Sequence, residues 1–181
     1  MRLFIGITID DQTRIACASV ATRLEGCGVN ARFVDPENYH MTLVFLGSVY
    51  SGRLCDIVAA TRGVAQRHAP FLLAFDRIGA FPHERKPRVI FVGSRGADNA
   101  YRVLSAQVRE VCAALGYGSE NDAVPHVTLA RVPGRVKTTL PMLEIDPFEV
   151  AVDALTVFDS VPRNGKTRYE KRAAFPLTRA G

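Results

Sequence analysis

Apolar residues recur along the chain with two different spacings, and segments of one kind follow segments of the other. Three segments place apolar residues three or four positions apart, which gathers them on one face of an α-helix. Other segments carry short apolar runs or alternating apolar positions, as β-strands do. Helices are expected within residues 11–27, 54–65 and 101–115. Strands are expected at residues 2–9, 32–34, 40–46, 71–81, 88–92, 148–158 and 169–177, and from residue 125 onward.

The order of these elements indicates the fold class. Asp10 is placed to cap the first helix, and Gly28 and Gly116 are placed to end the first and the third. Helices interspersed with adjacent strand pairs are typical of an α+β fold with mainly antiparallel sheets. No flexible polar linker divides the chain, so we expect residues 1–181 to form a single domain of two interleaved lobes.

The tetrapeptide His-x-Thr-Leu occurs twice, beginning at His40 and at His126, each time inside a predicted strand. Side chains two positions apart in a strand project from the same face. Each copy therefore presents one imidazole and one hydroxyl, those of Thr42 and Thr128, to a common surface. If an internal pseudo-twofold relates the copies, both pairs meet across a cleft. Such a cleft is suited to general acid–base catalysis on a phosphodiester.

The alternative is a structural role for these residues. A single histidine in an apolar strand is more often a hydrogen-bonded structural residue, and threonine suits strands through its branched side chain. The repeat changes the balance, because the chain has only 4 histidines and two of them occupy matching strands. We therefore favour a functional role for both copies.

Composition and charge narrow the choice of partner. The net charge of +5 favours an anionic partner. No apolar run approaches the ~20 residues of a membrane span, and the N-terminus enters a strand directly, so we expect a cytoplasmic protein without membrane contact. Basic residues gather in three predicted loops, at Arg85, Lys86 and Arg88, at Arg131, Arg135 and Lys137, and at Arg163, Lys166 and Arg168.

Neither a disulfide nor a metal is expected. The cysteines at positions 17, 27, 55 and 112 form no C-x-x-C pair, and three fall on apolar helix stripes, where a free thiol is a small buried hydrophobe. A metal held by His40 and His126 would need further ligands, and no Cys, Asp or Glu lies at a useful offset from either motif. We expect no cofactor.

With these motifs, the sequence resembles the two-histidine (2H) phosphoesterases and, within them, the bacterial and archaeal RNA 2′,3′-cyclic phosphodiesterases once called 2′-5′ RNA ligases. The resemblance implies a LigT-like bilobal fold, with two mainly antiparallel sheets around a central cleft and helices outside. The segments that carry it are residues 2–5, 36–47, 79–82, 87–93, 125–131 and 175–177, together with Tyr169.

The resemblance also implies roles for individual residues. His40 would be the proton donor to the ribose 3′-oxygen and His126 the proton acceptor that activates water, giving a 2′-phosphomonoester without a metal. Thr42 and Thr128 would bind the phosphate. The substrates would be RNA 3′ ends or small 2′,3′-cyclic nucleotides, and we expect a monomer.

Family members use two further positions near the nucleotide, which correspond here to Phe45 and Arg131. Strict strand alternation puts both side chains on the face opposite the histidines, so their involvement requires either a β-bulge or a position at the end of the strand. Residues 121–124 depart from the Phe-Arg pair that is common in the family before the second motif.

Two functions remain open. The first is a cyclic phosphodiesterase. The second is an RNA-binding or 2′-5′ end-joining protein in which the same cleft holds RNA and hydrolysis is slow. Paired proton-transfer groups favour the enzyme, because a protein that only binds RNA has no need of them.

Overall fold

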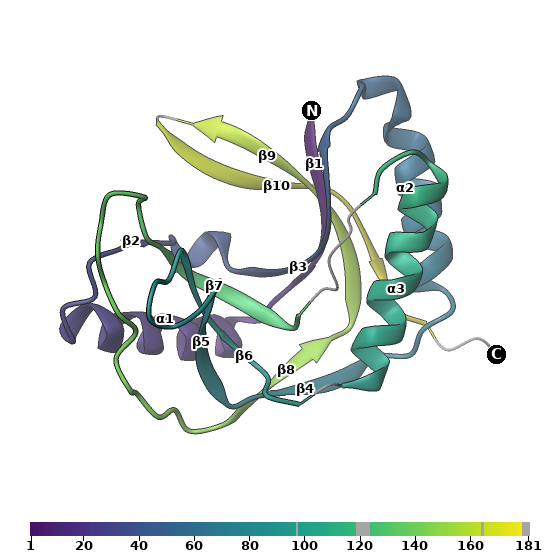
Figure 1. Cartoon of the computed structure of the whole chain (residues 1–181). Coiled ribbons are helices and arrows are strands. Elements are labelled where there is room, and N and C mark those ends of the chain that lie inside the picture. The colour runs from purple at the N-terminus through teal and green to yellow at the C-terminus, as the bar shows by residue number, and fades with distance from the viewer. Residues whose placement is uncertain (97, 119–123, 164, 179–181) are drawn as a thin grey trace.

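The computed structural model describes residues 1–96, 98–118, 124–163 and 165–178 (Figure 1). The helices are α1 (Asp11–Gly26), α2 (Leu54–Ala65) and α3 (Asn99–Ala114), with short 3-10 turns at Pro36–Asn38 and Ser51–Arg53. The strands are β1 (Arg2–Thr8), β2 (Arg32–Phe33), β3 (His40–Ser48), β4 (Phe71–Phe75), β5 (Arg77–Phe81), β6 (Val89–Gly93), β7 (His126–Arg131), β8 (Phe148–Val152), β9 (Ala154–Arg163) and β10 (Lys166–Pro176).

These strands form two four-stranded sheets and one two-stranded ribbon. The first sheet has the order β10-β9-β1-β3, the second has the order β2-β7-β6-β5, and the ribbon pairs β4 with β8. All pairings among the described strands are antiparallel, which confirms the predicted α+β class. The C-terminal strands β9 and β10 complete the sheet that the N-terminal strands β1 and β3 begin, so the two halves of the chain interleave.

Two predicted strands are wrong in the same way. The apolar runs at residues 71–81 and 148–158 are each two strands that belong to different sheets. Asp76 separates β4 from β5, and Asp153 separates β8 from β9. The carbonyl of Asp153 accepts a hydrogen bond of 2.7 Å from the backbone N–H of Leu177, outside any ladder. The apolar pattern continues across both breaks, so it does not reveal where the chain changes sheet.

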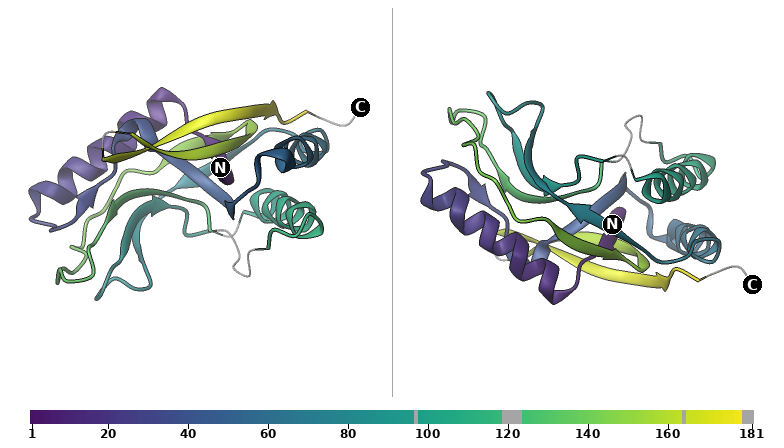
Figure 2. Two further views of the ribbon diagram at one scale, coloured as in Figure 1. Left: turned by 90° about the horizontal axis from the view of Figure 1, so that it is seen from above. Right: turned by 90° about the horizontal axis from the view of Figure 1, so that it is seen from below.

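The helices lie outside the sheets. Helix α2 packs against α3 and against β9 and β10, α3 packs against β3, and α1 packs against β7 and β8. Figure 2 shows α1 at one end of the molecule and the α2–α3 pair at the other. None of the described helices is long and apolar enough to span a membrane.

The predicted helix ends are confirmed. The carboxylate of Asp10 accepts a hydrogen bond of 2.7 Å from the backbone N–H of Thr13, which caps α1. Gly28 and Gly116 follow α1 and α3 with φ angles of 78° and 87°, a left-handed conformation that other residues rarely adopt.

The cysteines follow the prediction only in part. Cys17 and Cys112 are buried on the inner faces of α1 and α3, whereas Cys27 and Cys55 are exposed. The expectation of three buried helix thiols is therefore wrong. Cys27 lies beyond the last residue of α1, where the chain has already left the helical stripe.

Candidate active site

The two motifs lie on β3 and β7, which contact each other at the boundary between the two four-stranded sheets. His40 opens β3 and His126 opens β7. Met41 and Val127 are fully buried, whereas the flanking histidines and threonines are partly exposed. The predicted alternation within each tetrapeptide is confirmed.

A β-bulge interrupts that alternation in β3. Ile5 of β1 pairs with Val44 and Gly6 pairs with Thr42, so Leu43 has no partner. An unpaired extra residue returns the following side chains to the other face of the strand. Phe45 consequently lies on the histidine face, directly opposite Phe4. The Phe4 ring is 5.8 Å from the Phe45 ring and 4.8 Å from the His40 ring.

Strand β7 contains the same bulge at the equivalent position. Ile90 of β6 pairs with Ala130 and Phe91 pairs with Thr128, which leaves Leu129 unpaired. Arg131 therefore returns to the face of His126, and its charge acts on both histidines. The bulges thus place Phe45 and Arg131 on the histidine face, where strict alternation would not.

Both imidazoles are held by the same backbone contact. Nδ1 of His40 lies 2.7 Å from the carbonyl oxygen of Asn38, and Nδ1 of His126 lies 2.7 Å from the carbonyl oxygen of Val124. A carbonyl oxygen can only accept, so Nδ1 carries the proton and donates it in each ring. Nε2 is then the atom available for proton transfer. The hydroxyl of Thr42 lies 3.0 Å from Nε2 of His40 and donates to it when the ring is neutral.

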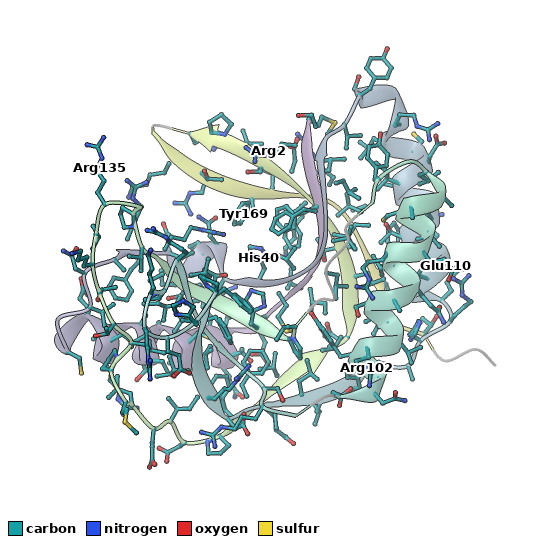
Figure 3. All side chains as sticks on the ribbon, in the orientation of Figure 1. Arg2, His40, Arg102, Glu110, Arg135 and Tyr169 are labelled. Carbon is teal, nitrogen blue, oxygen red and sulfur yellow. The ribbon has the colours of Figure 1, made fainter. Side chains whose placement is uncertain are left out.

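Aromatic rings enclose both imidazoles. The His40 ring lies 4.7 Å from the Tyr169 ring (Figure 3). It also lies 5.7 Å from the Phe158 ring, in addition to its contact with Phe4. The His126 ring lies 5.2 Å from Phe81 and 5.2 Å from Phe91. These rings come from strands far apart in sequence, and only the pairing register reveals that they surround the histidines. They displace water from the imidazoles and lower the local dielectric.

This burial lowers the pKa of both histidines. Burial lowers the pKa of His40 to about 4. The hydrogen bond to the Asn38 carbonyl opposes this decrease in pKa, and the charges of His126 and Arg131 add to it. Burial also lowers the pKa of His126, the Val124 carbonyl opposes the shift, and Arg131 adds to it. A proton on one ring disfavours a second on the other. A bound phosphodiester anion acts in the opposite direction, so the occupied site is suited to holding one proton on the pair.

The described residues around the histidines offer no set of metal ligands. Within the described ranges, no group of three or more His, Cys, Asp or Glu could hold an ion. The described groups around the imidazoles are aromatic rings, the Thr42 hydroxyl and two backbone carbonyls, and the carbonyls already accept the Nδ1 protons. Such a donor set does not fit zinc or manganese.

We therefore expect full activity in excess EDTA, because the acid–base chemistry predicted from the two motifs uses only the imidazoles and the hydroxyls. The measurement is hydrolysis of a 2′,3′-cyclic nucleotide before and after chelation and dialysis. Loss of turnover that Zn²⁺ or Mn²⁺ restores would contradict the metal-free site.

The predicted site residues thus share one face of two neighbouring strands. His40, Thr42 and Phe45 come from β3, and His126, Thr128 and Arg131 come from β7. Of residues 121–124, where the sequence departs from the Phe-Arg pair, residues 121–123 lie outside the described residues.

Comparisons with known proteins agree with this arrangement. The profile of a family described as LigT like phosphoesterase matches the chain twice, over residues 7–91 and 92–169. An RNA 2′,3′-cyclic phosphodiesterase of Archaeoglobus fulgidus is 36% identical over 133 residues, 73% of each chain. One from Aeropyrum pernix is 32% identical over 158 residues, 81% of this chain and 89% of its own.

Solved structures give the same result. The crystal structure of TT0787 of Thermus thermophilus matches all of both chains with a TM-score of 0.84 at 27% identity. Apo LigT of E. coli shares the fold, with a TM-score of 0.79 over 98% of each chain at 24% identity. Matched in both halves by one family profile and over its whole length in three dimensions, the chain belongs to the LigT-like phosphoesterases, the two-histidine family that its repeated motif indicated.

Proposed function

We propose that this protein is an RNA 2′,3′-cyclic phosphodiesterase that opens terminal cyclic phosphates to 2′-phosphomonoesters without a metal. The main support for this activity is the pair of imidazoles on neighbouring strands. In each imidazole Nδ1 donates to a backbone carbonyl, which leaves Nε2 for proton transfer. The names of the relatives from Archaeoglobus fulgidus and Aeropyrum pernix support the same reaction.

The proposed reaction divides the proton transfers between the rings. Nε2 of His126 takes a proton from water while the water oxygen bonds to phosphorus. The bond from phosphorus to the ribose 3′-oxygen breaks, and Nε2 of His40 donates its proton to that oxygen. Each positioned acid or base typically contributes ~10²–10⁴-fold to the rate. The family resemblance supports this direction, since the two strands carry nearly equivalent groups.

The remaining residues act on the phosphate and the nucleoside. We assign Thr42 and Thr128 as donors to the non-bridging oxygens, where negative charge grows during the reaction. For this role, the Thr42 hydroxyl turns away from Nε2 of His40. Arg131 offsets the phosphate charge from the same face. The Phe45 ring is 62% exposed beside the site and offers a stacking surface to the base.

The identity of the product tests this proposal. Phosphorus NMR of a hydrolysed 2′,3′-cyclic nucleotide is expected to show a 2′-phosphate. A 3′-phosphate would reverse the assignment of donor and acceptor while leaving the two-histidine mechanism intact. Tight binding of 2′-5′-linked RNA without appreciable hydrolysis would instead favour the binding or end-joining protein.

The pH dependence follows from the lowered pKa values. The active form carries one proton on the histidine pair, so kcat/KM should be bell-shaped. Because both pKa values lie below the usual 6.5 in the free site, we expect the kcat/KM maximum below pH 6.5. The kcat maximum should lie at higher pH, because the bound anion stabilises the imidazolium. A kcat/KM maximum at alkaline pH would contradict this assignment.

We further propose that the protein acts as a cytoplasmic monomer and that residues 1–181 form one domain. In support, the first sheet combines strands from both ends of the chain, so neither half completes its sheet alone. A single, concentration-independent unfolding transition is the expected result.

A further inference from the structure

A basic pocket opens beside the candidate active site. Residues 85–88 and 134–139 line a hollow of about 630 Å³, which is within the usual size range of ligand sites. The cations that define this basic pocket are Arg85, Lys86, Arg88, Arg135 and Lys137.

Two backbone hydrogen bonds connect the walls of the basic pocket to the strands that carry the candidate active site. Phe81 contacts the His126 ring, and its carbonyl accepts a hydrogen bond of 2.6 Å from the N–H of Arg88. The Arg88 carbonyl in turn accepts a hydrogen bond of 2.9 Å from Val132, the residue after Arg131. The wall formed by residues 85–88 is therefore bonded to Phe81, whose ring contacts His126. The wall formed by residues 134–139 follows Arg131 and Val132 in the chain.

The charge of the basic pocket is not neutralised by the protein. No carboxylate lines it, and none of its five cations forms an ion pair within the described part of the chain. Arg88 is half-buried and donates a hydrogen bond of 3.2 Å to the carbonyl of Pro133, which orients its guanidinium on the wall. Five positively charged side chains around one hollow favour a ligand with several negative charges.

We propose that the basic pocket binds the phosphodiester backbone of the nucleotides that precede the cyclic end, so that RNA chains are better substrates than cyclic mononucleotides. This inference rests on the function proposed above. A cyclic mononucleotide has one phosphate. In the proposed function this phosphate binds to the two histidines and the two threonines, so nothing in the mononucleotide reaches the basic pocket. An RNA chain carries further phosphates at a spacing that can continue from the cleft into the pocket, where each neutralised phosphate adds affinity that depends on salt.

The test compares two substrates and three proteins. The substrates are a 2′,3′-cyclic mononucleotide and an RNA oligonucleotide that ends in the same cyclic nucleotide. The proteins are the wild type, the Arg135→Gln/Lys137→Gln variant and the matched Arg67→Gln/Arg102→Gln variant. Arg67 and Arg102 are also exposed and outside any ion pair among the described residues. Figure 3 shows Arg102 at the opposite side of the molecule from Arg135.

The wild type is expected to have a higher kcat/KM for the oligonucleotide, and this advantage should fall as salt increases. Loss of Arg135 and Lys137 should reduce the advantage about tenfold, mainly through KM, and should reduce the slope of log KM against log salt by about 1.4, the value for two phosphate contacts on a single strand. The Arg67 and Arg102 variant should keep the wild-type advantage and slope.

The other outcomes separate the two proposals. Equal kcat/KM for both substrates, or an undiminished advantage in the Arg135 and Lys137 variant, overturns the RNA pocket and leaves the cyclic phosphodiesterase standing. If the wild type hydrolyses neither substrate, the proposed function fails and this inference fails with it.

Discussion

Replacing either His40 or His126 by alanine is expected to lower kcat by at least about 10²-fold, since each variant loses one of the two proton-transfer groups. The double variant should be little worse than either single variant, because the two groups act in one step. The measurement is steady-state hydrolysis of a 2′,3′-cyclic nucleotide, with thermal unfolding recorded for each protein.

The matched control is His68→Ala. The His68 ring bonds to Gln107, with 3.1 Å between Nε2 and Oε1, on the helical side of the molecule. Its loss removes an imidazole outside the cleft and should leave turnover unchanged. Near-full turnover in a folded His40→Ala or His126→Ala protein would show that the corresponding histidine is structural.

Adding a single methyl group at Gly93 is expected to destabilise the fold by about 3 kcal/mol or more. Gly93 of β6 pairs directly with His126. A Cβ at this position would lie 2.4 Å from the carbonyl oxygen of Pro125 and 3.3 Å from Cα of His126. Both are backbone atoms, so no side-chain rotation relieves the clash, and Gly93→Ala must displace the start of β7. Activity should fall together with stability.

Gly63→Ala provides the matched control. Gly63 lies within α2, and a Cβ there would meet nothing within 4 Å. This variant should gain roughly 0.5–1 kcal/mol, because alanine loses less conformational entropy than glycine in a helix. Denaturant midpoints of the two variants give the comparison. Equal denaturant midpoints for Gly93→Ala and Gly63→Ala would contradict this prediction, because they would mean that β6 and the start of β7 can move apart to accommodate the methyl group without loss of stability.

The features that could be predicted from the sequence are those with a local cause. The three helices and the Asp10 cap follow from side-chain spacing and from one side-chain-to-backbone hydrogen bond. Alternation along a strand is likewise local, so the shared face of His40 and Thr42 needed no tertiary information. Cys27 continues the apolar spacing of the first helix but is exposed, because α1 ends at Gly26.

Which side chains surround the histidines depends on strand pairings between residues distant in sequence. A bulge exists only relative to the neighbouring strand, so the pairing with β1 and β6 places Phe45 and Arg131 on the same face as the histidines. The rings of Tyr169 and Phe158 reach His40 through the pairing of β10, β9 and β1. The lowered pKa values arise from the burial that these contacts produce, which no sequence spacing expresses.

The residue pattern is enough to predict the helices, the antiparallel α+β class and the two motifs that each present an imidazole and a hydroxyl on one face. Each of these properties depends on residues within a few positions of one another. The breaks of the apolar runs at Asp76 and Asp153, and the contact between the two motif strands, depend on long-range contacts. Strand pairing joins residues far apart in the chain, and one apolar run fits either sheet until its partners are present.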